Sequence, residues 1–165
     1  MKKRPRIKVS LSTADKIVEL ASGAVLLLMW IWILVHYSGL PDIIPIHYNG
    51  AGEADGFGSK GNILILPAVA TVLSAGFTLL NQFPHIFNYP VRITEENASG
   101  QYRNMTRMVR YLKLILVAIL GFIEFKTIAN VHNNTQELGT WFLPLVLAIV
   151  IIPLLYFMIK SWNTK

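Results

Sequence analysis

Four long apolar stretches, separated by shorter polar segments, dominate the hydropathy pattern of the chain. They run from Leu20 to Tyr37, from Ile63 to Phe83, from Tyr111 to Val131 and from Trp141 to Ile159. Each stretch is long enough to cross about 30 Å of hydrocarbon as a helix. The pattern therefore predicts an all-α, polytopic membrane protein with four transmembrane helices.

Composition points to the same class of protein. Hydrophobic residues make up 53% of the 165 residues and charged residues only 15%, whereas soluble domains carry roughly 25% charged residues. The chain contains no cysteine, which excludes disulfides, thiolate metal sites and cysteine nucleophiles. The expected environment, and the first partner, is the lipid bilayer.

Basic residues are unevenly divided among the polar segments. The first 16 residues and the segment 84–110 hold most of the 15 Lys and Arg residues, whereas 132–140 has none and 40–61 has only Lys60. The positive-inside rule then places both termini and the 84–110 connection in the cytoplasm, and the 40–61 loop outside. Because this topology accounts for the net charge of +6, we expect no nucleic-acid partner.

These features divide a single membrane domain, residues 1–165, into four parts. They are a basic cytoplasmic tail (1–16), a helix-loop-helix region (17–83), a cytoplasmic connection with an amphipathic helix (84–110) and a second helix pair (111–165). Ser12 or Thr13 can cap the first helix, with Asp15 in its first turn, where the helix dipole favours an acid.

The 84–110 connection carries its own helix signal. Thr94-Glu95-Glu96-Asn97 offers an N-cap with acidic residues beside it, which predicts a helix start. Arg103, Arg107 and Arg110 recur at spacings of four and three, so they share one face of that helix. This face predicts either an interfacial helix resting on anionic lipid or a contact site for a cytoplasmic protein.

Turn-forming residues and chemically capable side chains gather in the segment 40–61. It contains two prolines, five glycines and the turn dipeptides Asn49-Gly50 and Asp55-Gly56. At about twenty residues it is longer than a simple connector needs, so we expect an ordered Gly/Pro-rich external loop. The candidate ligand-binding residues of this loop are His47, Asn49, Asp55, Ser59 and Lys60.

Metal and phosphate chemistry are weakly supported in this loop. A single His beside carboxylates lacks the paired-His spacing of zinc sites, and Phe57 stands where a phosphate-binding Walker loop needs its second Gly. We therefore expect no metal and no cofactor. Two alternatives stay open: Asn49 and Asp55 hydrogen-bond their own turns while Lys60 marks the membrane boundary, or the loop offers a contact surface to a peptide or small ligand.

Two charged residues, Glu124 and Lys126, fall within the third apolar stretch. A charge in hydrocarbon costs roughly 2.5–3.5 kcal/mol, so such residues usually face a cavity or a partner. Residues two apart on a helix point to different faces, so these two are poor partners for each other. The carboxylate could instead pair with His36, His132 or Lys60, or it could serve an ion- or proton-coupled carrier.

The loop also resembles a known signature. Leu40-Pro41-Asp42-x-Ile44-Pro45-x-His47-x-Asn49-x-x-Gly52-x-x-Asp55-x-x-Gly58-Ser59-Lys60 is similar to that of a bacterial membrane domain of unknown function, DUF1648, which also forms the N-terminal part of SdpI-type immunity proteins. The resemblance covers about residues 15–83. It implies the cytoplasmic (inner) membrane of a bacterium, and it brings no established catalytic residues.

Those immunity proteins protect a producing cell from its own membrane-active toxin and can relay the presence of the toxin to a transcriptional repressor. They carry further membrane spans, whereas four are predicted here. No serine–histidine–acid order or nucleophile elbow is visible. We therefore expect a non-enzymatic integral membrane protein that binds a peptide toxin or small ligand at its external loop, in immunity or envelope sensing. The alternative is a carrier that uses Glu124.

Overall fold

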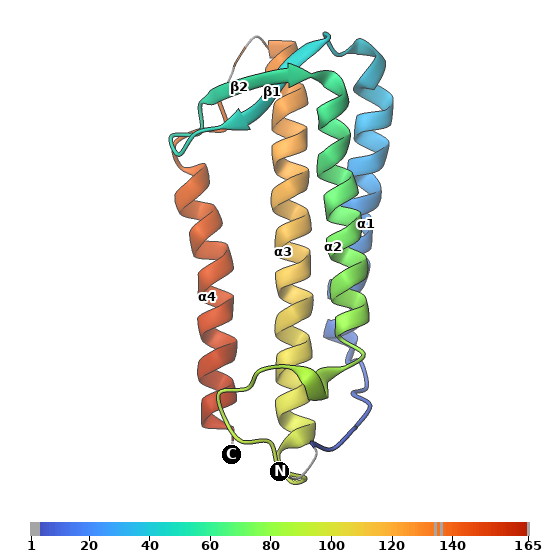
Figure 1. The fold of residues 1–165 in the computed structure, drawn as a ribbon, viewed down its shortest axis with the longest axis vertical. Coiled ribbons are helices and arrows are strands. Elements are labelled where there is room, and N and C mark those ends of the chain that lie inside the picture. Colours follow the sequence, from blue (N-terminus) through green and yellow to red (C-terminus); the bar gives the residue numbers. More distant parts are fainter. Residues whose placement is uncertain (1–3, 134, 136, 165) are drawn as a thin grey trace.

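The computed structural model describes residues 4–133, 135 and 137–164. Within them four long helices stand side by side as a bundle (Figure 1): α1 (Thr13–His36), α2 (Ile65–Leu80), α3 (Ala98–Asn133) and α4 (Phe142–Asn163). Each, counted with adjoining 3-10 turns, is long and apolar enough to cross a membrane. The prediction of a helical, polytopic membrane protein is thus confirmed. We name the end where α1 begins and α4 ends the terminal end, and the opposite end the hairpin end.

The start of α1 follows the prediction. Ser12 is the N-cap; its side chain accepts a hydrogen bond from the Asp15 amide (3.2 Å), and the Asp15 carboxylate accepts one from the Ser12 amide (2.9 Å). This reciprocal capping box satisfies two amides that a helix start would otherwise leave unpaired. It also fixes the carboxylate where the helix dipole favours a negative charge.

The course of α3 differs from the predicted boundary at residue 110. The helix begins at Ala98, directly after the predicted start signal Thr94-Glu95-Glu96-Asn97, but it runs without a break to Asn133. The segment 98–110 is therefore the first part of a long upright helix and not a separate amphipathic helix lying on the surface (Figure 1). Its charged residues suggest a surface position in the sequence, yet Arg107 is half-buried and Arg110 is buried, and both pair with α1, as described below.

The loop between α1 and α2 is an antiparallel β-hairpin of β1 (Ile43–Tyr48) and β2 (Ala54–Ser59), and it lies across the hairpin end of the bundle (Figure 1). His47 on β1 pairs with Gly56 on β2. The sequence predicts an ordered loop but not these strands, because the glycines of β2 weaken the alternating pattern that is typical of a strand.

An apolar cluster anchors the hairpin to the helices. Its buried members are Ile33, Leu40, Ile44, Ile63 and Ile128. Leu40 and Ile44 come from the loop, and the other three come from α1, α3 and the turn that precedes α2. Burying each such side chain contributes about 1.5–3 kcal/mol. The hairpin is therefore packed onto the bundle.

Candidate functional site

On the hairpin, His47 and Asp55 meet across the two strands. His47 Nδ1 lies 2.5 Å from Asp55 Oδ1, and the two side chains are 69% and 44% exposed. Ion pairs that are this exposed contribute little to stability, because water screens them. A ligand could therefore displace this pair at little cost, although the pair lies on a surface and not in a cavity.

The other three loop candidates contact their own surroundings. Asn49 Oδ1 accepts hydrogen bonds from two amides of its turn, at 2.9 and 3.1 Å, and Ser59 Oγ accepts one from the amide two residues on, at 3.4 Å. Lys60 Nζ lies 3.2 Å from Asp42 Oδ1 and donates to the Leu40 carbonyl at 3.3 Å. Among the described residues, no three His, Asp or Glu side chains gather as a metal site. The structure thus brings two of the five candidates together.

The tip of the hairpin is fastened to the rest of the molecule. The Leu138 amide donates to the Gly52 carbonyl (2.7 Å), and the Tyr48 hydroxyl lies 3.0 Å from Thr127 Oγ1 of α3. Gly52 has a φ of 83°, and a Cβ at this position would lie 2.6 Å from the Gly139 carbonyl oxygen. Glycine is required there for both reasons. The hairpin is therefore a fixed cap over the helix ends.

Glu124 is buried in the part of α3 nearer the hairpin end, with 1% of its surface exposed. Neither carboxyl oxygen has a hydrogen-bond partner among the described residues. The side chain lines a cavity of about 350 Å³ between α1 and α3. Trp32 of α1 lines the same cavity, and its indole Nε1 is also buried without a partner in the part of the chain that is described. Because unpaired buried polar groups are rare and costly, they mark this cavity as a candidate binding site.

The partners expected for Glu124 are engaged elsewhere. His36 and His132 each donate from Nδ1 to the carbonyl one turn earlier in their own helices, at 2.8 and 2.9 Å. Lys60 pairs at the base of the hairpin. Lys126 is half-buried and does not line the cavity. Among the described residues, none of the three candidates pairs with Glu124, so the predicted pairing is wrong. Backbone carbonyls bind the two histidines, and Asp42 binds Lys60.

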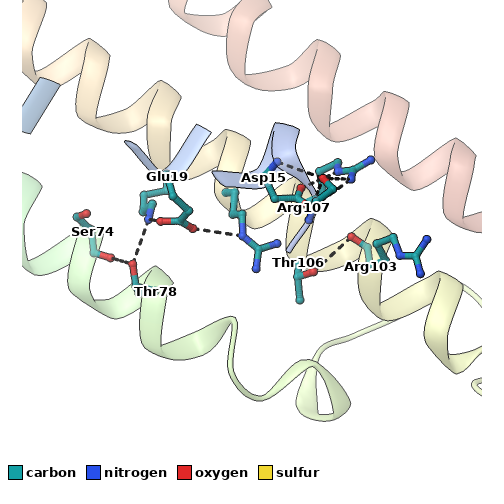
Figure 2. A network of polar contacts seen from close by, with 10 residues as sticks. Asp15, Glu19, Ser74, Thr78, Arg103, Thr106 and Arg107 are labelled. Carbon is teal, nitrogen blue, oxygen red and sulfur yellow. Dashed lines mark hydrogen bonds and ion pairs between the residues drawn. The ribbon is translucent and has the colours of Figure 1, made fainter. Parts of the chain in front are cut away.

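At the terminal end, a network of ion pairs joins α1 to α3 (Figure 2). Arg107 contacts Asp15 at two points: Nε donates to Oδ1 at 2.8 Å and Nη2 donates to Oδ2 at 3.2 Å. Nη2 also donates to Ser12 Oγ at 2.9 Å. The Asp15 side chain is only 3% exposed. Two-point recognition of a carboxylate fixes the geometry as well as the strength of the contact.

Glu19, one turn further along α1, is the second centre of this network. One carboxylate oxygen lies 3.2 Å from Arg110 Nε, and the other accepts a hydrogen bond from Lys113. Lys113, which is 2% exposed, also donates to Thr78 Oγ1 of α2 at 3.0 Å. Contacts from three helices therefore converge here (Figure 2). Charges buried in membrane helices usually pair in this way.

The spacing of the α3 arginines predicts a contact with lipid or with a cytoplasmic protein, and not this network with α1. A usable signal is nevertheless present. Asp15 and Glu19 lie four residues apart, so they share one face of α1. Arg107, Arg110 and Lys113 recur every three residues along α3. Opposite charges on two helix faces indicate that the helices are neighbours.

The segment before α1 is folded back along the connection between α2 and α3. Arg4 donates to the Phe87 carbonyl (2.6 Å) and lies over the Tyr89 ring, 5.5 Å from its centre. The Tyr102 hydroxyl of α3 donates to the Pro5 carbonyl (2.9 Å). Burial raises the pKa of the Tyr89 hydroxyl above its ordinary range, so this group keeps the proton that it donates to a nearby carbonyl. From Arg4 onward, the basic tail is an ordered part of the fold.

Comparison with known proteins places the chain in a family. Residues 24–71, which include most of α1, the hairpin and the start of α2, match the model of a domain of unknown function (DUF1648). The chain is also similar to an uncharacterized protein of Archaeoglobus fulgidus, with 33% identity over 144 residues that cover 79% of this chain and 78% of that protein. No solved structure matches.

The four spanning helices and the hairpin that caps them define an integral membrane protein. The chain belongs to the DUF1648 family. This confirms the resemblance carried by the loop signature.

Proposed function

We propose that this chain is a non-enzymatic membrane protein that binds a small apolar ligand with a polar group in the cavity at Glu124. The observation that carries this proposal is the presence of two unpaired polar groups, the Glu124 carboxyl and the Trp32 indole N–H, on residues that line one otherwise apolar cavity. Both groups are buried behind the wall of the cavity, and a ligand would reach them through a local turn of these side chains. Its volume, about 350 Å³, falls in the range of small-molecule sites, about 300–1,000 Å³.

The lining indicates the chemistry of the ligand. Aliphatic and aromatic side chains, such as Met29 and Phe122, form most of the wall and would bury an apolar body. A donor on the ligand would hydrogen-bond to Glu124, and an acceptor would receive the N–H of Trp32. Amines, alcohols and peptide amides offer such groups. Leu28 on the rim is exposed, so the ligand can enter from the bilayer.

The family resemblance supports a setting for this binding. A toxin that acts on membranes has the apolar body and polar group that the cavity would accept, which favours immunity or envelope sensing. The distribution of Lys and Arg along the sequence supports placing the terminal end in the cytoplasm. With that orientation in the cytoplasmic (inner) membrane, the Glu124 cavity lies in the outer half of the bilayer, beneath the hairpin.

Two other candidate functions rest on particular observations. Recognition of a peptide by the hairpin itself is supported by the exposure of the His47–Asp55 pair. An ion- or proton-coupled carrier is supported by the burial of Glu124 within a membrane helix. A contact site for another protein at 84–110 is less well supported, because Arg107 and Arg110 already pair with α1.

The test uses two probes, 2-naphthylmethylamine and 2-methylnaphthalene, which differ by one amino group. Detergent-solubilised protein should bind the amine about tenfold more tightly, as expected for one hydrogen bond to a carboxyl group. Glu124→Leu should abolish this preference, and equal preference in both proteins would overturn the proposal. A preference that disappears instead in His47→Ala/Asp55→Ala would favour the hairpin. Proton uptake into liposomes that is lost in Glu124→Gln would favour the carrier.

A further inference from the structure

A second cavity lies at the terminal end, opposite the Glu124 cavity along the bundle. Its volume is about 860 Å³. Its walls come from the segment before α1, Glu19 of α1, the last turn of α2, the residues that follow α2 and Arg110 of α3. The segments on either side of it are held together by the Arg4 contact to the Phe87 carbonyl (2.6 Å). This cavity is therefore a built feature of the fold.

Positive charge dominates the walls of this cavity. Arg6 and Lys8 line it from the segment before α1, and Arg110, which is 6% exposed, lines it from α3. Glu19 is the acid on the wall, and it already pairs with Arg110 and Lys113. In the described part of the chain, no ion pair joins Arg6 or Lys8 to an acid. An anion in the cavity would meet these two cations first.

Asn81, directly after α2, adds a hydrogen-bonding group. Both polar atoms of its side chain, Oδ1 and Nδ2, are buried and have no partner among the residues described. The side chain lines the cavity. An amide nitrogen donates two hydrogen bonds, and a buried donor without a partner is costly. Neither amide atom has accessible surface in this conformation, so an oxygen-rich group in the cavity would satisfy the donor after the Asn81 side chain turns toward it.

The remaining walls are apolar and lie near one end of a membrane span. Leu11 and Phe83 line the cavity and are exposed. Phe83 follows the end of α2 at Leu80, so the cavity lies at the level where this span leaves the hydrocarbon. Basic side chains beside exposed apolar ones at this level match a phospholipid, with its phosphate inside and its acyl chains along the apolar edge.

We propose that this cavity binds the phosphate group of an anionic phospholipid headgroup. Arg6 and Lys8 neutralise the charge, and Asn81 Nδ2, turned toward the cavity, donates to a phosphate oxygen. The N-terminal segment is then one wall of a lipid site, as well as a topology signal. The site is separate from the Glu124 cavity, and its test does not depend on the function proposed there.

The test measures lipid binding to the purified full chain by native mass spectrometry, with phosphatidylglycerol and phosphatidylcholine as probes. Phosphatidylglycerol should bind about tenfold more tightly than phosphatidylcholine. Arg6→Gln/Lys8→Gln should weaken phosphatidylglycerol binding about 30-fold, because each cation near an anionic surface contributes about fivefold. The matched control, Lys16→Gln/Arg103→Gln, removes two exposed cations that do not line the cavity and should change binding less than about twofold.

Each alternative has a distinct outcome. Equal losses in the two double variants would indicate general attraction to the basic end of the bundle and would overturn the proposal, as would equal binding of the two lipids. If soluble glycerol phosphate raises the unfolding temperature as much as phosphatidylglycerol does, the site takes a free phosphate and the lipid assignment is wrong. Asn81→Leu keeps every charge but removes the donor, so it should weaken phosphatidylglycerol binding about fivefold; unchanged binding would overturn the proposal even if the double variant misfolds.

Discussion

Arg107 of α3 and Asp15 of α1 are 92 residues apart in the sequence, yet Arg107 Nε lies 2.8 Å from Asp15 Oδ1. The same carboxylate closes the capping box at the start of α1. One acid therefore fixes both where α1 begins and how α1 is placed against α3. Because the Asp15 side chain is almost fully buried, water cannot take the place of either partner when the other is removed.

Replacing this acid should destabilise the fold strongly. We expect Asp15→Ala to lower the free energy of unfolding by about 3–5 kcal/mol, because it leaves the Arg107 charge without its partner. Ser12→Ala removes the cap hydroxyl but keeps the ion pair, and should cost about 1 kcal/mol. Unfolding titrations in mixed micelles measure both. Arg103→Ala is the control: Arg103 is exposed on the helix that carries Arg107, and its replacement should change the free energy of unfolding by less than about 0.5 kcal/mol. Equal losses of stability in Asp15→Ala and Ser12→Ala would show that the ion pair contributes little.

Because Glu19 has two cationic partners, we expect its replacement to destabilise the protein more than the replacement of Lys113. Glu19→Met leaves two buried cations, Arg110 and Lys113, without their acid, whereas Lys113→Met leaves the acid paired with Arg110. Uncompensated buried charge is the larger cost, so Glu19→Met should destabilise by about 2 kcal/mol more than Lys113→Met. The same unfolding titration tests this order. The reverse order would mean that Arg110 does not share the carboxylate.

Local features of this fold can be predicted from the sequence, and contacts between distant segments much less so. The cap formed by Ser12 and Asp15 is predictable because its partners are three residues apart. The contact of Lys113 with Glu19 spans 94 residues, and hydropathy alone does not show which charges will face each other. Glu124 is recognised as an intramembrane acid from its position, but its lack of an internal partner depends on how α1 and α3 pack.

Removing the unpaired carboxyl should stabilise the protein in the absence of ligand. Glu124→Leu replaces a buried group without a hydrogen-bond partner by an apolar side chain of similar size. We expect the free energy of unfolding to rise by about 1–3 kcal/mol, the usual cost of such a group. Glu96→Leu, at an exposed position, is the control and should stay within about 0.5 kcal/mol. A loss of stability in Glu124→Leu would instead indicate that the carboxyl makes a favourable contact in the folded protein.

Two glycines of the hairpin turn provide a matched test of how the cap is fixed. Gly52 combines a φ of 83° with a clash of any added Cβ against the Gly139 carbonyl oxygen at 2.6 Å, whereas a Cβ at Gly50 would meet only Leu143 Cδ2 at 3.8 Å. Gly52→Ala should therefore destabilise by about 1–3 kcal/mol and Gly50→Ala by less than about 0.5 kcal/mol. Hydrogen exchange at the Leu138 amide, which donates to Gly52, should accelerate in Gly52→Ala alone. If exchange there stays slow, the tip does not depend on this contact, and the hairpin must be held by the apolar cluster around Ile44 instead.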